Sequence, residues 1–172
     1  MTVVLKRLPD GAPILIRPIR ADDKRMLENG LRHLSPQSVQ RRFLTPKRSF
    51  SRAELRYLTE VDGRDHVALV AEYPGDPVRR LIAVARFVRL HDDPDAAEAA
   101  IVVADDWQRR GLGSLLAEEL AAEARALGIR RFTATMASDN FPAHRLLERL
   151  TFHLETSHVG SGVSEVVFEL AA

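Results

Sequence analysis

The chain has 172 residues, of which 45% are hydrophobic and 28% charged, and its formal net charge is +1. This length fits one domain, spanning residues 1–172, that can bury a core on both faces of a sheet. The sequence contains no cysteine, which excludes disulfides, thiolate metal sites and cysteine-based acyl-enzyme chemistry. A nearly neutral chain has no overall attraction to nucleic acid or to an anionic membrane, so we expect neither as a partner.

The beginning of the chain predicts a cytoplasmic protein. Residues 1–10 include Lys6, Arg7 and Pro9 and lack the apolar stretch of a secretory signal. No apolar run approaches the roughly 20 residues of a membrane-spanning helix. Basic residues are concentrated in one early segment, which we interpret as a solvated face. They are Arg41, Arg42, Lys47, Arg48, Arg52 and Arg56.

The first third of the chain predicts one strand followed by helices. Apolar β-branched residues alternate through Ile14 to Ile19, which indicates a strand. Asp22 or Asp23 can cap a helix that continues to residue 34. Ser35 and Ser51 are suitable N-caps for two further short helices, and a proline follows the first of them.

The middle of the chain predicts a hairpin, a buried strand and a helix. His66 to Tyr73 and Leu81 to Leu90 have strand composition and enclose a Pro-Gly-Asp-Pro turn. Ala99 to Val103 is a continuous apolar run, typical of a central strand. Apolar residues then recur at helical spacing from Gly113 onward, and Gly128 ends this helix. The remaining predicted elements are a strand at 132–136, a helix at 142–150 capped by Asn140 or Ser138, and a hairpin of 152–158 with 163–170.

The order of strand, glycine loop, helix and strand from Ala99 to Met136 implies a crossover between two parallel neighbours. Antiparallel hairpins flank this unit. The predicted fold class is therefore α/β, with a mixed sheet.

The loop between the central strand and the long helix is a candidate phosphate site. Gln108 to Ser114 places backbone N–H groups at a helix N-terminus, where Gly111 and Gly113 allow an anion to approach closely. Arg109 and Arg110 add positive charge. The spacing fits neither a P-loop nor a dinucleotide fingerprint, and spacing alone is equally consistent with a plain strand-to-helix turn.

The segment Gln108-Arg109-Arg110-Gly111-Leu112-Gly113 resembles the acetyl-CoA loop of the GCN5-related N-acetyltransferase (GNAT) family, which has the form Gln/Arg-x-x-Gly-x-Gly/Ala. Asn140-Phe141-Pro142-Ala143, followed by Leu146 and Phe152, is similar to a later segment of that family. Within the family, residues 97–108 and 16–20 are similar to the acetyltransferase domain of bacterial protein lysine acetyltransferases. The resemblance covers nearly the whole chain.

This resemblance implies a mixed, mostly antiparallel sheet of about six to seven strands with helices on both faces. A central parallel pair of strands would splay to admit acetyl-CoA as co-substrate. Backbone groups of Ile101, Val102 and Val103 would pair with the pantetheine arm, and Asn140 would face the coenzyme from the other side. The residues implied to hold the pyrophosphate are Gln108, Arg109, Arg110, Gly111, Leu112, Gly113 and Ser114.

Glu98 is the candidate general base for deprotonating an acceptor amine. It begins a strand of small and apolar residues, and a carboxylate partly withdrawn from water there would be a better base. Without the resemblance, a solvated carboxylate would be the simpler interpretation. Strand amides at Val102 or Val103 are candidates to stabilise the thioester oxyanion. No histidine pair has metal-ligand spacing, so we expect no metal.

Two residues depart from the family pattern. Many members have Tyr where Leu147 stands, as the acid that protonates the departing thiolate, and Gly where Thr151 stands. The acid is therefore unassigned, and water is one alternative. Trp107 is interpreted as a core anchor and His144 as a surface residue.

The predicted reaction is acetyl transfer to a primary amine, for which the resemblance favours a protein lysine. A small amine (amino acid, polyamine or aminoglycoside) is an alternative, for which Asp92, Asp93 and Asp95 could supply carboxylates. A non-catalytic acyl-CoA sensor is an alternative of another class. The sequence leaves open the acyl-chain preference and the oligomeric state, including a homodimer.

Overall fold

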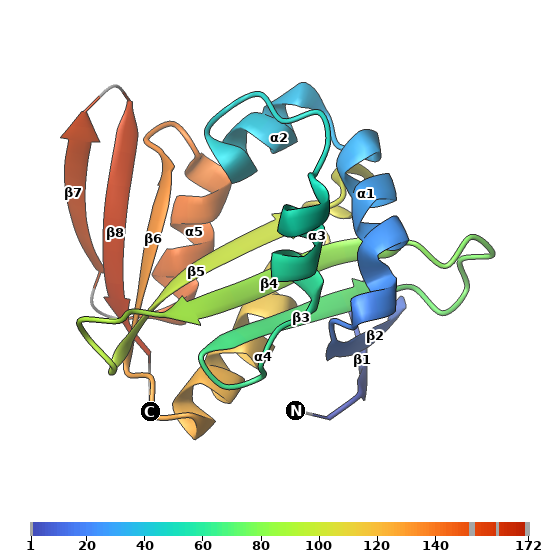
Figure 1. Cartoon of the computed structure of the whole chain (residues 1–172), viewed down its shortest axis with the longest axis horizontal. Helices are drawn as coiled ribbons and strands as arrows, with labels where there is room; N and C mark the ends of the chain where they lie inside the picture. The colour runs from blue at the N-terminus through green and yellow to red at the C-terminus, as the bar shows by residue number, and fades with distance from the viewer. Residues whose placement is uncertain (1, 152–153, 161, 171–172) are drawn as a thin grey trace.

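The structure is a computed structural model that describes residues 2–151, 154–160 and 162–170. Its centre is a twisted eight-stranded sheet in the order β1-β2-β3-β4-β5-β6-β8-β7 (Figure 1). Neighbouring strands are antiparallel except for the parallel pair β5 and β6. The strands are β1 (Val4–Arg7), β2 (Pro13–Pro18), β3 (His66–Glu72), β4 (Leu81–Arg89), β5 (Ala96–Val103), β6 (Arg131–Ala137), β7 (Leu154–Gly160) and β8 (Val163–Glu169).

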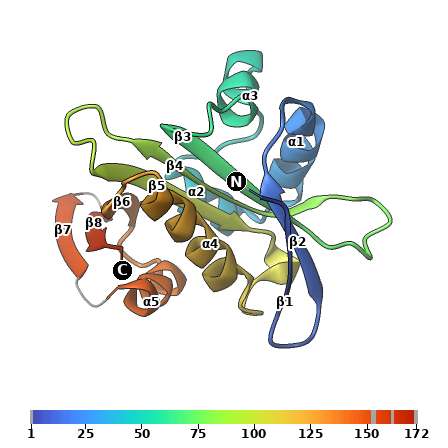
Figure 2. The same cartoon turned by 90° about the horizontal axis from the view of Figure 1, so that it is seen from below.

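Helices cover both faces of the sheet. The helices are α1 (Lys24–His33), α2 (Pro36–Phe43), α3 (Arg52–Thr59), α4 (Leu112–Ala126) and α5 (Phe141–Leu150). Figure 2 shows α1 and α3 on one side of the sheet and α4 and α5 on the other. The main core fills the space between the sheet and α4, and a smaller core lies under α1 and α3. This agrees with the predicted mixed fold class.

The helix ends follow the local signals in the sequence. The Ser35 hydroxyl accepts a hydrogen bond from the Ser38 N–H (3.2 Å), and Ser51 forms a reciprocal capping box with Glu54. Asn140 is the N-cap of α5. Gly128 follows α4 with φ of 83°, the left-handed conformation that commonly ends a helix.

Two differences from the predicted elements change the edges of the sheet. Eight strands are present rather than six to seven, because residues 4–7 pair with β2 as a short edge strand whose side chains are mostly exposed. Such a strand carries little hydrophobic pattern. Strand β5 also begins at Ala96, three residues before the expected start at Ala99. Phe152 lies outside the described residues, so its place in the expected hairpin is not assigned.

The parallel pair β5 and β6 separates along its length. The strands are in register only from Ala96 opposite Arg131 to Glu98 opposite Thr133. Beyond Glu98, β5 continues to Val103 with β4 on one side only. One edge of the central strand is therefore open in the middle of the sheet.

A buried ion cluster joins the first strands to the helix that follows them. Arg17 on β2 donates two hydrogen bonds to the Asp23 carboxylate (2.7 and 2.8 Å) and one to Glu72 on β3 (2.6 Å). All three side chains are at most 8% exposed.

Within the described ranges, no helix has both the length and the apolar character needed to cross a bilayer.

Candidate active site

The turn before α4 presents a row of backbone N–H groups. Leu115 is the first helix residue whose N–H finds a backbone acceptor, the Gly111 carbonyl at 3.0 Å. Among the residues that the structure describes, none accepts a hydrogen bond from the N–H groups of residues 109–114. These donors lie at the positive end of a 15-residue helix, so the turn can bind an anion such as a diphosphate.

Left-handed backbone conformations give the turn its shape. Arg109 has φ of 59° and Gly111 has φ of 88°, and such successive turns direct N–H groups toward one point. A Cβ atom at Gly111 would lie 3.2 Å from the Pro9 Cδ. Glycine at position 111 is thus required both by the backbone angle and by the close approach of the β1–β2 loop.

Replacing Gly111 by valine is expected to weaken acetyl-CoA binding by about 10-fold or more, because a β-branched residue is strained by about 1–3 kcal/mol at positive φ. Calorimetric titration with acetyl-CoA measures the change. Gly160→Val is the matched control, since Gly160 also has positive φ (98°) but meets no atom within 4 Å and lies at the end of β7. Equal affinities for the wild type and Gly111→Val would contradict the role of this turn.

The polar side chains of the turn do not all face the anion site. The Gln108 side chain points inward, and its Nε2 donates to the Val103 carbonyl and to the Ser38 hydroxyl, both at 3.0 Å. Arg110 forms an ion pair with Asp10 (2.7 Å). We therefore expect Gln108 to shape the turn rather than to contact phosphate through its side chain, whereas the Arg109 side chain is exposed.

Trp107 is a buried core residue that anchors the turn, as expected. Its ring is 6% exposed and packs against Tyr73 with centroids 5.2 Å apart. The Arg110 guanidinium lies 4.1 Å from the Trp107 ring centroid, a cation–π contact. This packing holds the turn in place.

Hydrogen bonds also join the turn to the segment between α1 and α2. Asp105 lies just before Trp107, and its carboxylate accepts from the Ser35 N–H (2.8 Å) and from the Ser35 and Ser38 hydroxyls (both 2.7 Å). Burial acts to raise the pKa of Asp105, but these hydrogen bonds outweigh it and lower the pKa below its ordinary value. The carboxylate is therefore ionised at neutral pH and fixes the start of α2 beside the turn.

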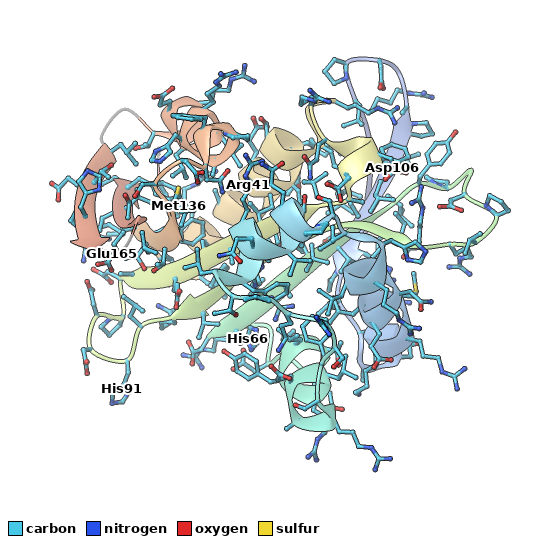
Figure 3. The ribbon with its side chains drawn as sticks, turned by 90° about the horizontal axis from the view of Figure 1, so that it is seen from above. Arg41, His66, His91, Asp106, Met136 and Glu165 are labelled. Atoms are coloured by element: carbon cyan, nitrogen blue, oxygen red, sulfur yellow. The ribbon has the colours of Figure 1, made fainter. Side chains whose placement is uncertain are left out.

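A cavity of about 310 Å³ occupies the opening between β5 and β6. Glu98, Asn140 and Leu147 all line it, and Arg41 and Met136, labelled in Figure 3, line it from α2 and β6. The structure thus brings the predicted base and the predicted coenzyme-facing asparagine to one opening. Glu98 is exposed, so in the described structure its carboxylate is not withdrawn from water as expected.

The backbone N–H and C=O groups of β5 alternate between β4 and the open edge of the strand. The Ala104 N–H donates to the Ile82 carbonyl, and the Leu90 N–H donates to the Ala96 carbonyl, both at 2.9 Å. Because an antiparallel ladder alternates, the even-numbered β5 residues bond to β4 and the odd-numbered ones face away from it. Of the two amides expected to stabilise an oxyanion, that of Val102 therefore faces β4, and that of Val103 faces the opening.

Asn140 and Leu147 approach the opening from α5. The Asn140 Oδ1 accepts from the Ala143 N–H at 3.4 Å, and the residue is 9% exposed. Leu147 is 6% exposed and carries no proton donor. Thr135 contributes a hydroxyl to the lining, whereas His144 does not line this cavity.

Sequence reasoning missed two basic residues of the site. Arg41 and Arg42 were expected on a solvated face, but both line the cavity beside Glu98. Burial lowers the pKa of Arg42 and the charge of Glu98 acts in the opposite direction. A sequence pattern does not reveal this placement, because it depends on how α2 packs against β5 and β6.

The acidic loop before β5 lies elsewhere. Asp93 forms an ion pair with Arg131 (2.5 Å), and Asp95 lines a different cavity near the end of α4. Neither they nor Asp92 line the opening at Glu98. This loop therefore does not form the carboxylate-lined pocket that the small-amine alternative would use. In the part of the chain that the structure describes, no three His, Asp or Glu side chains are grouped as metal ligands.

Comparisons with known proteins find relatives in both sequence and fold. A family model described as the acetyltransferase (GNAT) family matches residues 35–152. The chain is 36% identical over 151 residues to acetyltransferase Pat of Mycolicibacterium smegmatis, which covers 87% of this chain and 44% of that protein. It is 30% identical over 136 residues to acetyltransferase PA5475 of Pseudomonas aeruginosa, covering 79% and 73% of the two chains.

Its fold is similar to that of the GNAT domain of S. lividans PAT, with a TM-score of 0.87, 30% identity, and coverage of 98% and 97%. It is also similar to a cAMP-binding acyltransferase from Mycobacterium smegmatis, with a TM-score of 0.67 and 30% identity over 48% of that chain. The chain spans less than half the length of this acyltransferase and of Pat.

Proposed function

The chain belongs to the acetyltransferase (GNAT) family, and from this premise we propose that it transfers the acetyl group of acetyl-CoA to the side-chain amine of a protein lysine. One observation carries the proposal. The free N–H groups of residues 109–114 follow the C-terminal end of β5, and Glu98 and Asn140 line the cavity beside the open edge of that strand. Residues 1–172 would act as one domain.

The residues fit acetyl-CoA as substrate. The backbone N–H groups of residues 109–114 would hold the diphosphate, because they are unpaired donors at a helix N-terminus. The backbone groups of Ile101 and Val103 that face away from β4 would pair with the pantetheine arm. These contacts would leave the thioester beside Glu98, where β5 and β6 separate.

The reaction would be a direct transfer. Glu98 accepts a proton from the acceptor amine, whose nitrogen then forms a bond to the carbonyl carbon as the carbon–sulfur bond breaks. An N–H group on the open edge of β5 beside the thioester would stabilise the developing charge on the carbonyl oxygen. As the amide forms, its nitrogen loses a second proton. Coenzyme A leaves as the thiolate and takes up that proton through water, since Leu147 cannot supply one.

Two observations favour a protein lysine over a small amine. The acidic loop of Asp92, Asp93 and Asp95 does not line the opening, so the carboxylates that would bind a polyamine are not in place. Similarity to a spermidine N-acetyltransferase from Vibrio cholerae is at 17% identity and concerns the fold alone. The relatives reported above are named as acetyltransferases or acyltransferases, and none supports a non-catalytic sensor.

The experiment is an acceptor panel with acetyl-CoA, in which free thiol is measured together with mass spectrometry of the products. The panel contains lysine peptides, a folded protein mixture, spermidine, an aminoglycoside and free amino acids. We expect thiol release and a mass increase with lysine-containing proteins or peptides. Turnover with spermidine or the aminoglycoside alone would replace the lysine proposal. Tight coenzyme binding without thiol release for any acceptor would contradict the catalytic role.

A further inference from the structure

A second cavity, of about 410 Å³, lies on the α1 and α3 side of the sheet. It borders the first cavity, because Arg42, Phe43 and Ala100 line both. Charge is unevenly distributed over its walls. Its charged lining residues are Arg42, Asp76, Arg79, Arg80 and Arg86, so four cations face one carboxylate.

Ion pairs neutralise only one end of this cavity. Arg80 bonds to the carboxylates of Asp76 (2.9 Å) and Asp106 (2.5 Å), and Arg79 lies 3.9 Å from Glu72. The other end contains Arg42 and Arg86. Among the residues that the structure describes, neither has an ion-pair partner within 4.0 Å.

Arg86 is fixed in place but not neutralised. It is 6% exposed, and its guanidinium contacts the His66 Nε2 and donates to the Leu58 carbonyl, both at 3.1 Å. Burial and the charge of Arg42 lower the pKa of Arg86 to about 10, and Tyr57 acts weakly in the opposite direction. Burial and then the charge of Arg86 lower the pKa of His66 to about 4. His66, labelled in Figure 3, is therefore neutral at pH 7.

Two cationic guanidiniums thus act on each other, and Glu98 provides an opposing charge for Arg42. Leaving buried charge of one sign without a partner is costly. An anion entering this end of the cavity would relieve that cost and receive charge-assisted hydrogen bonds. Arg42 has donors to offer, since within the described residues it makes a cation–π contact with Phe43 (5.0 Å) and electrostatic interactions with Glu98 and Arg86.

The pair is close to the candidate base. Arg86 lies directly opposite Ala100 in the β4–β5 ladder, and Glu98 lies opposite Val88. Opposite residues share a face, so Arg86 and Glu98 are diagonal neighbours on the same face of the sheet. The Cα atoms of such neighbours are about 7–8 Å apart. A lysine amine placed at Glu98 would therefore bring the acceptor residues beside it close to Arg86.

From this geometry we propose that Arg42 and Arg86 bind a carboxylate carried by the acceptor, namely an Asp or Glu side chain beside the acceptor lysine. The inference rests on the proposed function and specifies its substrate class. A cationic wall repels a bare ammonium or a polyamine, whereas an adjacent carboxylate compensates for it. Arg42 and Arg86 are thus specificity-determining residues rather than catalytic ones.

The test separates binding from turnover. Three fluorescent peptides are compared that differ only beside one central lysine, where they carry Glu, Gln or Lys. Binding is measured by anisotropy with coenzyme A present, and acetylation is measured separately with acetyl-CoA. We expect the Glu peptide to bind about 10-fold more tightly than the Gln peptide, since hydrogen bonds to charged groups are the stronger class. The Lys peptide should bind most weakly.

Arg42→Gln should remove the difference between the Glu and Gln peptides. Arg86→Lys, which keeps the buried charge but loses the planar fork, should reduce the difference. Arg48→Gln is the matched control, because Arg48 is exposed and lines neither cavity.

Equal binding of the three peptides would overturn the inference, whether or not they are acetylated. A preference for the Glu peptide that Arg42→Gln removes, without any acetylation, would support the anion site and contradict the proposed function. Displacement of the Glu peptide by free glutamate at equal concentration would assign the carboxylate to a small molecule and overturn the peptide source.

Discussion

Glu98→Gln is expected to lower kcat at pH 7 by about 10²–10⁴-fold, the range that a positioned general base contributes. Glutamine has nearly the shape of glutamate but cannot accept the proton of the acceptor amine. A free lysine amine has a pKa near 10.4, so only about one molecule in a thousand is deprotonated at neutral pH. The loss should therefore shrink as the pH rises toward that value and the solution supplies the free amine.

Initial rates of thiol release over a range of about pH 6 to 10 measure this effect. Acetyl-CoA affinity should change little, since Glu98 lies outside the turn of residues 109–114. Glu118→Gln provides the control, because Glu118 is exposed on α4 and lines neither cavity. A rate profile for Glu98→Gln that parallels the wild type at every pH would remove Glu98 from the role of base.

The second large effect concerns stability. Arg17→Met is expected to destabilise the protein by about 3–5 kcal/mol, because it leaves the carboxylates of Asp23 and Glu72 buried without their shared partner. Urea unfolding followed by circular dichroism measures the free energy of unfolding. Arg25→Met, at an exposed position on α1, should change it by less than about 0.5 kcal/mol. A similar small change for Arg17→Met would show that the buried cluster contributes little.

The pH dependence of this cluster follows from Asp23. Burial acts to raise the pKa of Asp23, but hydrogen bonds from Arg17 and the Arg20 N–H outweigh it, and the folded-state pKa is lowered. A lowered folded-state pKa contributes stability that is present above the unfolded pKa, about 3.9, and is lost as the pH falls below it. The stability that ionised Asp23 contributes to the wild type should therefore be full at neutral pH and should be lost as the pH falls below about 4.

Most of the fold could be predicted from local patterns. Ser35, Ser51 and Asn140 cap their helices as expected, because capping depends on neighbours only a few residues away. The buried strands are long apolar runs, so they too were evident. Residues 4–7 were missed because an exposed edge strand is specified by its pairing with β2 rather than by its own hydrophobic pattern.

The candidate site was predicted less completely, since it depends on contacts between distant segments. The loop at residues 108–114 has a local signature, and its unpaired N–H groups are as expected. Arg42 reaches Glu98 and Arg86 only because α2 folds across the gap between β5 and β6. The direction of the Gln108 side chain likewise depends on Ser38, which is 70 residues away.

Gln108 and Asp105 connect two regions that, under the two proposals, would contact different reactants. Both side chains bond to the Ser38 hydroxyl at the start of α2, and Arg42 lies one helical turn further along. If binding of the coenzyme makes the turn of residues 109–114 more rigid, it should therefore also restrain α2 and Arg42, which we propose to contact the acceptor. This architecture favours an ordered kinetic sequence, in which the nucleotide-bearing reactant arrives first and prepares the surface for the second.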